Sequence, residues 1–316
     1  MLVVRGADTV PASAKGAVLA IGNFDGVHRG HQALLADVRA HAARLGAPAG
    51  VMVFEPHPRE FFMPDEPHFH LTPMPLKLAC FDELGLDVAI VSTFDAALAS
   101  LSASDFITQQ LVERLAPRHV VIGYDFFFGK GRTGTPETMR EAGARMGFGV
   151  SVIAPVAEGG EVFSSTAIRL KLAQGDIAGA EHALGRLWRV AGVVRGGAKR
   201  GTGLGFPTAN IALDPGTALA HGIYAVWAEV EGERHAAAAY LGTRPTFDDG
   251  APVLEVFLLD FDGDLYGREL SVSFVAHIRG DRRFDGAEAL KTQMQIDCDA
   301  ARRILATAST VSRCGG

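Results

Sequence analysis

The spacing of apolar runs changes near Leu187, and this change constrains the fold more than any other feature of the sequence. From Val18 to about Pro155, short apolar runs alternate with segments of helical periodicity. Such alternation is typical of a parallel sheet built from repeated strand–helix units. The expected strands are Val18 to Ile21, Gly50 to Phe54, Val88 to Ser92, His119 to Gly123 and Gly149 to Ile153. The first half is therefore predicted to be a doubly wound, Rossmann-like α/β domain.

Helical segments separate these runs and have recognisable ends. The segment His31 to Leu45 places Leu34 and Val38 at helical spacing. The segment Ser102 to Leu115 opens with a Ser-x-x-Asp capping pattern and is stopped by Pro117. Both segments are expected to be helices between strands of the predicted sheet.

After Leu187 the strands follow one another closely, with turn residues between them. They are expected at Trp188 to Val194, Ile223 to Val230, Ala236 to Leu241, Val253 to Leu259 and Glu269 to Ile278. The gaps Glu231–Glu233 and Asp262–Asp264 have the length of hairpin turns, which favours an antiparallel sheet or small β-barrel. The segment Asp285 to Ala306 carries one apolar face and is expected to close the chain as a helix.

The helical stretch Thr166 to Leu187 separates the two patterns. A chain of 316 residues has room for two domains of about 150 residues each. The sequence therefore predicts one domain at residues 1–182 and a second at 183–316, each with its own core and site.

Charge and cysteine content argue against several classes of protein. Thirty Lys and Arg against 36 Asp and Glu give a net charge of −6, so the balance gives no indication of binding to a nucleic-acid backbone. Cys80, Cys298 and Cys314 lie far apart and match no disulfide or zinc spacing. We find no signal pattern and no apolar run near the roughly 20 residues that span a bilayer. A cytoplasmic protein that binds neither membranes nor nucleic acids is expected.

The most specific motif is Gly22-Asn23-Phe24-Asp25-Gly26-Val27-His28-Arg29-Gly30-His31, between the first expected strand and the first expected helix. His28 and His31 would share one face at a helix N-terminus, where amide groups and the helix dipole favour anions. Two imidazole donors there can stabilise charge on a phosphoryl group in transfer. The alternatives are surface histidines, or a metal pair for which Asp25 is the further ligand nearby. The flanking glycines and the preceding strand favour phosphate chemistry.

Three further segments stand at the ends of expected elements. In Ser164-Ser165-Thr166-Ala167-Ile168-Arg169 the hydroxyls can simply cap a helix, but Arg169 follows one turn later and its guanidinium matches phosphate oxygens. The segments Phe54 to Pro58 and Gly123 to Gly129 follow strands, at the sheet edge where open α/β folds bind ligands. The three phenylalanines Phe126 to Phe128 fit either core packing or the floor of a pocket for a flat aromatic ligand.

The second half contains a glycine-containing segment, Gly203 to Asn210, which follows the basic residues of Lys199-Arg200-Gly201. Glycines let amides converge on phosphates, and Thr208 and Asn210 can both reach a hard cation. A turn unrelated to any ligand is equally compatible with this string. Downstream, Glu255 interrupts an apolar strand: pointing inward it would be paired or functional, and pointing outward it would be an ordinary solvated residue. Sequence alternation does not decide between the two.

These motifs together resemble a known family. The His-x-Gly-His and Ser-Ser-Thr-x-Ile-Arg elements resemble the nucleotidyltransferase superfamily. The segments around Pro56 and Asp125 narrow the resemblance to the FMN adenylyltransferase module of bacterial bifunctional riboflavin kinase/FAD synthetases. The resemblance implies a nucleotidyltransferase-like fold in which His28 and His31 stabilise the α-phosphate of ATP during transfer. It also implies binding residues: Gly22, Phe24, Gly26, Ser164, Thr166 and Arg169 for ATP, and Pro56, His57 and Asp125 for the flavin.

The second half is similar to the riboflavin kinase module of the same enzymes, since its Gly-Phe-Pro-Thr-Ala-Asn string is present whole. This resemblance implies that Gly203, Thr208 and Asn210 bind ATP and that Thr208 and Asn210 hold its Mg²⁺. Glu255 would then be the base that accepts the proton of the ribityl hydroxyl. Arg244 stands where the family usually has Asn, and Phe257 where a His is common, so details of flavin binding and turnover are expected to differ.

The resemblance extends from about Val18 to Ala306 and implies two Mg²⁺-dependent reactions. Riboflavin and ATP would give FMN and ADP in the C-terminal domain, and FMN with a second ATP would give FAD and pyrophosphate in the N-terminal domain. One rival is a relative of the aminoacyl-tRNA synthetases, but the chain has no KMSKS-like loop. The other is a flavin-binding protein on a decayed scaffold, against which the retention of His28, His31, Asn210 and Glu255 argues.

Overall fold

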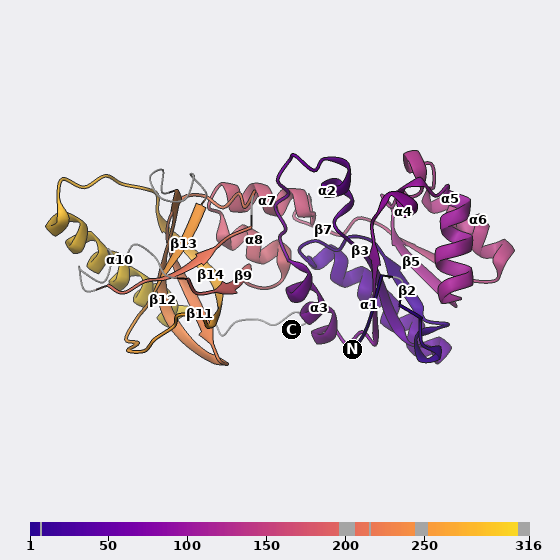
Figure 1. The fold of residues 1–316 in the computed structure, drawn as a ribbon, viewed down its shortest axis with the longest axis horizontal. Coiled ribbons are helices and arrows are strands. Elements are labelled where there is room, and N and C mark those ends of the chain that lie inside the picture. The colour runs from indigo at the N-terminus through magenta and orange to yellow at the C-terminus, as the bar shows by residue number, and fades with distance from the viewer. Residues whose placement is uncertain (7, 196–205, 215, 244–251, 309–316) are drawn as a thin grey trace. The chain divides into compact units, whose positions relative to one another are not determined.

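The computed structural model describes residues 1–316 except 7, 196–205, 215, 244–251 and 309–316 (Figure 1). The chain divides into two units, each with its own core. Of the described residues, the first unit contains Met1–Pro67 and Pro73–Ser164, and the second contains His68–Thr72 together with those that follow Ser164. The second unit thus includes a five-residue segment that comes from the first half of the sequence.

A six-stranded parallel sheet forms the centre of the first unit. Its strands lie in the order β1-β4-β3-β2-β5-β6. Their bounds are β1 Leu2–Arg5, β2 Val18–Ile21, β3 Ala49–Glu55, β4 Val88–Thr93, β5 His119–Gly123 and β6 Gly149–Ile153. The five strands expected from the sequence are confirmed to within one residue at each end. Strand β1 was not foreseen, because it is a four-residue edge strand that pairs only with β4.

Helices cover both faces of this sheet, which confirms the doubly wound α/β prediction (Figure 1). Helices α1 (Arg29–Leu45) and α3 (Met74–Glu83) pack on one face through residues such as Val38 and Phe81. On the other face lie the π-helix η2 (Phe106–Glu113) and α6 (Pro136–Met146), through Leu111 and Met139.

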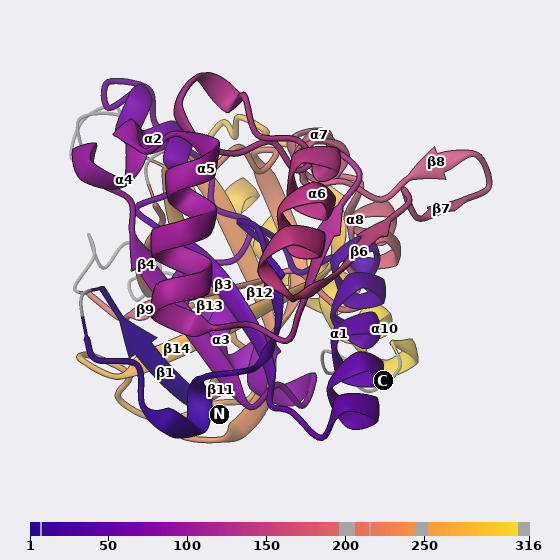
Figure 2. The ribbon, with the colours of Figure 1, turned by 90° about the vertical axis from the view of Figure 1, so that its right-hand side faces the viewer.

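The predicted helix at 102–115 begins as expected but is not a regular α-helix. Ser102 caps it, because the Asp105 backbone N–H donates to the Ser102 Oγ at 3.1 Å. The short helix α5 (Ala103–Asp105) then continues into η2. The remaining short elements of this unit are η1 (Ala12–Ala14), α2 (Pro58–Phe62), α4 (Ala96–Ser100), η3 (Lys130–Arg132) and the hairpin β7 (Ala157–Glu158) with β8 (Glu161–Val162). This hairpin projects away from the sheet (Figure 2).

The second unit is built on an antiparallel sheet in the order β10-β13-β12-β11-β14-β9. The bounds are β9 Arg189–Val193, β10 Ala209–Ala212, β11 Gly222–Val230, β12 Glu233–Thr243, β13 Pro252–Leu258 and β14 Glu269–Arg279. The two outer strands approach each other, since the Arg195 N–H donates to the Asn210 carbonyl oxygen at 2.9 Å. The sheet therefore curves into a near-barrel, as predicted, and strand β10 is an addition to the predicted set.

One of the two predicted hairpins is confirmed and the other is wrong. Glu231 and Gly232, both with positive φ, form the turn between β11 and β12. The gap Asp262–Asp264 does not join neighbouring strands, because β12 and β11 lie between β13 and β14. Turn length alone cannot reveal this, since the order of strands depends on long-range pairing.

Three helices belong to the described part of the second unit. Helix α10 (Ala287–Thr307) packs Cys298, Ala301 and Leu305 against one face of the sheet, as expected for the C-terminal helix. Helices α7 (Ser165–Ala173) and α8 (Ile177–Leu184) occupy the helical stretch predicted between the two strand patterns. In the part of the chain that the structure describes, no helix combines the length and apolarity needed to cross a membrane.

Candidate active sites

The first candidate site lies where the direction of strand addition reverses in the parallel sheet. From β2 the chain adds β3 and β4 on one side, and it then returns to place β5 on the other side of β2. The loops after β2 and β5 consequently diverge at the carboxyl edge of the sheet, which is where open α/β folds bind their ligands. The loop after β2 is Gly22–His28, the motif singled out from the sequence.

The Gly22–His28 loop has an unusual backbone. Phe24 and Val27 adopt positive φ angles of 49° and 44°, and Gly26 adopts 86°. Left-handed conformations are unfavourable for residues with a Cβ, so surrounding contacts must hold this loop. The ring of Phe24 is buried against Phe81, with centroids 5.8 Å apart. A Cβ on Gly22 would lie 3.2 Å from the Phe24 ring, which accounts for glycine at that position.

His28 and His31 are brought together at the start of α1. His28 is the N-cap, and its Nδ1 accepts a hydrogen bond from the His31 backbone N–H at 3.3 Å. The two imidazole rings stack with centroids 3.6 Å apart and planes 20° apart. Because Nδ1 of His28 is the acceptor in this hydrogen bond, a neutral imidazole at this position carries its proton on Nε2. The arrangement joins side-chain donors to a helix N-terminus, which favours a negatively charged group.

The predicted triphosphate residues fall on either side of the division between units. Ser164 ends the first unit, whereas Thr166 and Arg169 lie on α7 in the second. The Arg169 Nε donates to the Phe69 carbonyl oxygen at 2.8 Å, and its Nη2 lies 3.4 Å from the His68 Nε2. Arg169 therefore holds the 68–72 segment within the second unit.

The predicted flavin residues lie after β3 and β5. The Glu55–Pro56 peptide bond is cis. His57 caps the short helix α2, where its Nδ1 accepts from the Arg59 N–H at 3.2 Å and its own N–H donates to Glu60 at 2.9 Å. Asp125 is exposed in the loop after β5.

Aromatic side chains lie between these two loops, and two of them, Phe94 and Phe106, were not suggested as site residues by the sequence. The ring centroid of Phe54 lies 6.0 Å from that of Phe94 and 6.4 Å from that of Phe106. The centroids of Phe106 and Phe128 are 5.5 Å apart. Phe128 is buried, but Phe127 is 44% exposed, with the Arg132 guanidinium 5.4 Å from its ring centroid. Core packing, one of the two alternatives considered from the sequence, is therefore confirmed for Phe128, whereas a ligand pocket formed by these phenylalanines stays a prediction.

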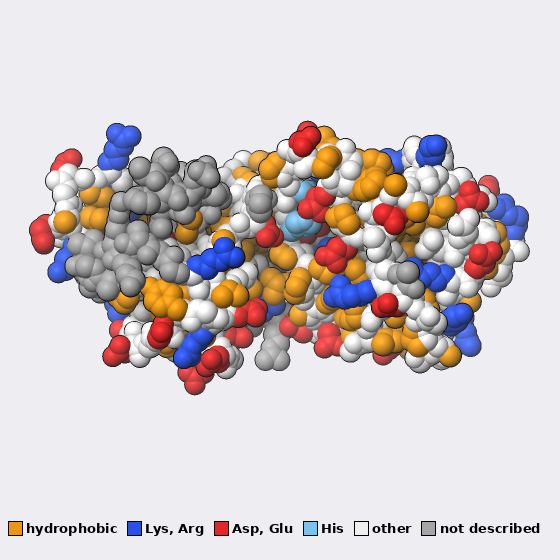
Figure 3. Space-filling model, viewed as in Figure 1, with side chains coloured by type: hydrophobic (Ala, Val, Ile, Leu, Met, Phe, Trp, Pro, Cys, Tyr) orange, Lys and Arg blue, Asp and Glu red, His pale blue; other side chains and the backbone are white. Residues whose placement is uncertain are grey.

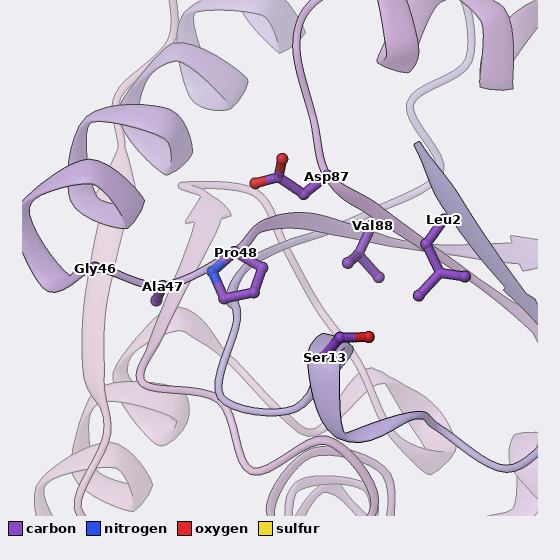
Figure 4. A pocket seen from close by; sticks show the side chains of 7 residues that line it. All are labelled: Leu2, Ser13, Gly46, Ala47, Pro48, Asp87 and Val88. Atoms are coloured by element: carbon purple, nitrogen blue, oxygen red, sulfur yellow. The ribbon is translucent and has the colours of Figure 1, made fainter.

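A pocket of about 500 Å³ lies at the opposite, amino-terminal edge of the parallel sheet (Figure 4). It is lined by Leu2, Ser13, Gly46, Ala47, Pro48, Asp87 and Val88. Its carboxylate is already engaged, because the Asp87 Oδ2 accepts from the Ala49 N–H at 2.8 Å. Parallel α/β sheets bind their ligands at the carboxyl edge, so this pocket is not the candidate site.

The second candidate site is on the near-barrel, where β10 and β13 pair. Asn210 stands directly opposite Glu255 in this pairing. The Thr208 Oγ1 donates to the Glu255 Oε2 at 3.3 Å, and the Asn210 Nδ2 donates to the Thr208 carbonyl oxygen at 3.3 Å. The sequence suggested Thr208 and Asn210 as a pair and Glu255 separately, and the structure places all three next to one another. Gly203 lies outside the described residues.

The orientation of Glu255, which the sequence left open, follows from the burial of its neighbours in β13. Leu254 and Val256 are fully buried on one face, so Glu255 lies on the other, half-buried beside Thr208. Phe257 shares the face of Glu255 and packs edge-on against Phe206 at 5.2 Å, as part of the layer beneath α10. Its departure from the family pattern thus has a packing role, while Arg244 lies outside the described residues.

The chemistry of this second set suits a hard cation. A hydroxyl, a carboxamide and a carboxylate offer oxygen ligands of the kind that Mg²⁺ prefers. Among the residues that the structure describes, no group of three or more His, Cys, Asp or Glu side chains is placed to hold a metal ion. On the surface shown in Figure 3, basic and acidic side chains are interspersed.

The two units thus define a class of protein: a doubly wound α/β domain with a histidine pair at a helix N-terminus beside its switch point, and a near-barrel domain in which Thr208, Asn210 and Glu255 are adjacent. Comparison with known families identifies both parts. Residues 10–167 match the FAD synthetase family, and residues 184–305 match the riboflavin kinase family.

Whole-chain relatives carry the same two parts. The chain is 42% identical over 307 residues to the bifunctional riboflavin kinase/FMN adenylyltransferase of Pseudomonas fluorescens, covering 97% of this chain and 98% of the relative. It is 40% identical to that of Escherichia coli K12, with 96% and 97% covered, and 36% identical to that of Bacillus subtilis, with 90% and 92% covered. A crystal structure described as a macrolide-efflux protein from Streptococcus pneumoniae superposes with a TM-score of 0.84 at 28% identity, covering 96% of this chain and 99% of that one.

The chain belongs to the bifunctional riboflavin kinase/FMN adenylyltransferase family. It is an enzyme with an FAD synthetase domain followed by a riboflavin kinase domain.

Proposed function

We propose that residues 183–316 phosphorylate riboflavin with ATP to give FMN and ADP, and that residues 1–182 adenylylate FMN with a second ATP to give FAD and pyrophosphate. The family matches at 10–167 and 184–305 support this division. The observation that carries the first assignment is the His28–His31 pair, stacked at a helix N-terminus at the switch point of the sheet.

In the first domain, His28 and His31 act as donors to the α-phosphate of ATP. A phosphate oxygen of FMN attacks the α-phosphorus, the bond to the β-phosphate breaks, and pyrophosphate leaves. Negative charge grows on the α-phosphate oxygens during this transfer, and preorganised N–H donors stabilise it more strongly than they stabilise the ground state. Gly22, Phe24 and Gly26 shape the loop for the nucleotide, and Ser164, Thr166 and Arg169 bind the triphosphate.

In the second domain, Glu255 accepts the proton of the ribityl hydroxyl as that oxygen attacks the γ-phosphorus of ATP. The hydrogen bond from the Thr208 hydroxyl occupies one oxygen of the carboxylate and restrains its orientation. Thr208 and Asn210 hold the Mg²⁺ of Mg-ATP, and Gly203 binds the nucleotide. When bound, the cation supplies positive charge that neutralises the phosphates.

Pro56, His57 and Asp125 bind the flavin in the first domain. They follow β3 and β5, and aromatic side chains lie between these two loops. A flat aromatic ring can stack on such side chains, while Asp125 offers an acceptor for polar groups. The enzyme works in the cytoplasm with riboflavin, FMN, FAD, ATP, ADP and pyrophosphate as its partners.

Two matched variants of the full chain test the division of labour. His28→Ala should lower FAD formation from FMN by about 10²- to 10³-fold, because one donor is lost, while riboflavin phosphorylation continues and FMN accumulates. Glu255→Gln should lower riboflavin phosphorylation by about 10²-fold or more, while added FMN is still converted to FAD.

Chromatography of flavins after incubation with Mg-ATP measures both reactions in one sample. Each variant serves as the control for the other, because the two residues lie in different units. FAD formation at the wild-type rate in His28→Ala would remove that histidine from the mechanism. Wild-type kinase activity in Glu255→Gln would do the same for the proposed base.

A further inference from the structure

Helix α3 presents a buried lysine to the Gly22–His28 loop. Lys77 is only 4% exposed, and its Nζ donates to the Asn23 carbonyl oxygen at 2.9 Å. Lysine is almost never this deeply buried unless its ammonium group is engaged. One partner of this ammonium group is the backbone of the loop that leads to the two histidines.

A second contact from the same helix meets the next residue of the loop. Phe81 is four residues after Lys77, so both side chains leave the same face of α3. The Phe81 ring packs edge-on against Phe24, the residue that follows Asn23. Helix α3 therefore contacts two consecutive loop residues, Asn23 through a charged hydrogen bond and Phe24 through an aromatic contact.

This double contact holds a backbone that would not keep its conformation alone. The loop has positive φ at Phe24 and Val27, which side chains with a Cβ disfavour. Its carboxyl end is fixed separately, since the Gln32 Nε2 donates to the Val27 carbonyl oxygen at 2.9 Å and His28 caps α1. Lys77 fixes the other end, directly after β2.

We propose that Lys77 is a positioning residue for adenylyl transfer, which holds the Gly22–His28 loop so that His28 and His31 meet the α-phosphate in the productive geometry. The inference rests on the proposed role of these histidines. Lys77 acts through the loop and does not contact the reacting atoms. Its ammonium group also places a positive charge beside a loop that carries the buried carboxylate of Asp25, which is 3% exposed.

The test compares Lys77→Met with Lys15→Met in the full chain, by steady-state conversion of FMN to FAD. Lys15 is an exposed lysine of the same unit and is the matched control. Lys77→Met should lower kcat by about 10- to 100-fold with little change in the KM for FMN, because misplaced donors affect the transition state more than binding. Riboflavin phosphorylation should be unchanged in both variants.

A double-mutant cycle with His28→Ala separates positioning from an independent role. If Lys77 works through His28, Lys77→Met in the His28→Ala background should cause less than a threefold further loss, whereas independent effects would multiply. Multiplicative losses, or a wild-type kcat in Lys77→Met, would overturn the inference. A wild-type rate in His28→Ala itself would instead overturn the proposed site, so the two failures are distinguishable.

Lys77→Arg keeps the positive charge and an N–H donor. This variant keeps the test informative if Lys77→Met does not fold. Because the arginine can still donate to the Asn23 carbonyl, it should retain at least about five times the kcat of Lys77→Met, or clear activity where that variant is unfolded. A folded Lys77→Arg, shown by its thermal unfolding, with no adenylyl transfer above the Lys77→Met level would contradict the assignment.

Discussion

Replacing Gly30 with alanine should slow adenylyl transfer without unfolding the enzyme. Gly30 lies in the first turn of α1, and a Cβ at this position would come within 3.1 Å of Cε1 and Nδ1 of His28 and within 3.3 Å of the Phe163 carbonyl oxygen. Contacts this short require the imidazole to retreat by a few tenths of an ångström. The hydrogen bond from the His31 N–H to His28, at 3.3 Å, is already long, so the retreat weakens it.

The size of the effect follows from this displacement. A misplacement of about 1 Å in an active site costs about 10²-fold in rate, so a few tenths of an ångström should lower kcat for FAD formation by about 3- to 10-fold. The free energy of unfolding should rise slightly or stay unchanged. Alanine is favoured over glycine within a helix by about 0.5 to 1 kcal/mol, which offsets the crowding around His28.

The assay is steady-state formation of FAD from FMN, combined with a thermal unfolding curve of each variant. Gly280→Ala is the control, since a Cβ there would meet no atom within 4 Å. Unchanged kcat in Gly30→Ala would refute the argument that the position of the His28 ring limits the reaction. A fall in melting temperature of more than about 5 °C would show that the crowding destabilises the fold instead.

Two other predictions concern stability. The rings of His119 and His41 stack with centroids 4.0 Å apart. Burial is the largest cause that lowers the pKa of His119 below its ordinary 6.5, and the charge of His41 lowers it further. The unfolded chain therefore takes up a proton first, so the first domain should lose stability as pH falls below about 6.5, and His119→Asn should flatten that dependence in melting curves at pH 7.5 and 5.5. A fragment that begins at His182 should fold and phosphorylate riboflavin, but it should melt below the full chain. It lacks the Leu71 carbonyl, which accepts from the Trp188 Nε1 at 3.0 Å. An insoluble or inactive fragment would contradict that domain boundary.

Much of the fold could be predicted because its local signals are strong. The buried strands of the parallel sheet are short apolar runs that helical segments separate, so their ends were placed to within one residue. Glu231 and Gly232 supply the positive φ angles that a two-residue hairpin requires, and the β11–β12 hairpin follows. The second predicted hairpin failed because the same kind of turn sequence also occurs between strands that do not pair.

The candidate sites were also predicted only where the residues that form them follow one another along the chain. The residue types and spacing of Gly22–His31 alone indicated an anion site, because a strand, a glycine-containing loop and a helix start follow one another directly along the chain. The aromatic residues Phe94 and Phe106 carried no comparable signal, since single phenylalanines are also ordinary core residues.

The sequence by itself predicted most of the strands and helices, the change from a parallel to an antiparallel sheet, and the candidate motifs of each half, but it did not predict strands β1 and β10. Only the tertiary structure decided which residues of these segments contact one another. It placed Glu255 beside Thr208, turned toward that hydroxyl and away from the barrel interior. It joined Lys77 to the Asn23 carbonyl and assigned residues 68–72 to the second unit. The physical reason is that periodicity and capping are local properties of the chain, whereas these contacts join residues tens of positions apart and depend on strand order and on which face of each element is buried.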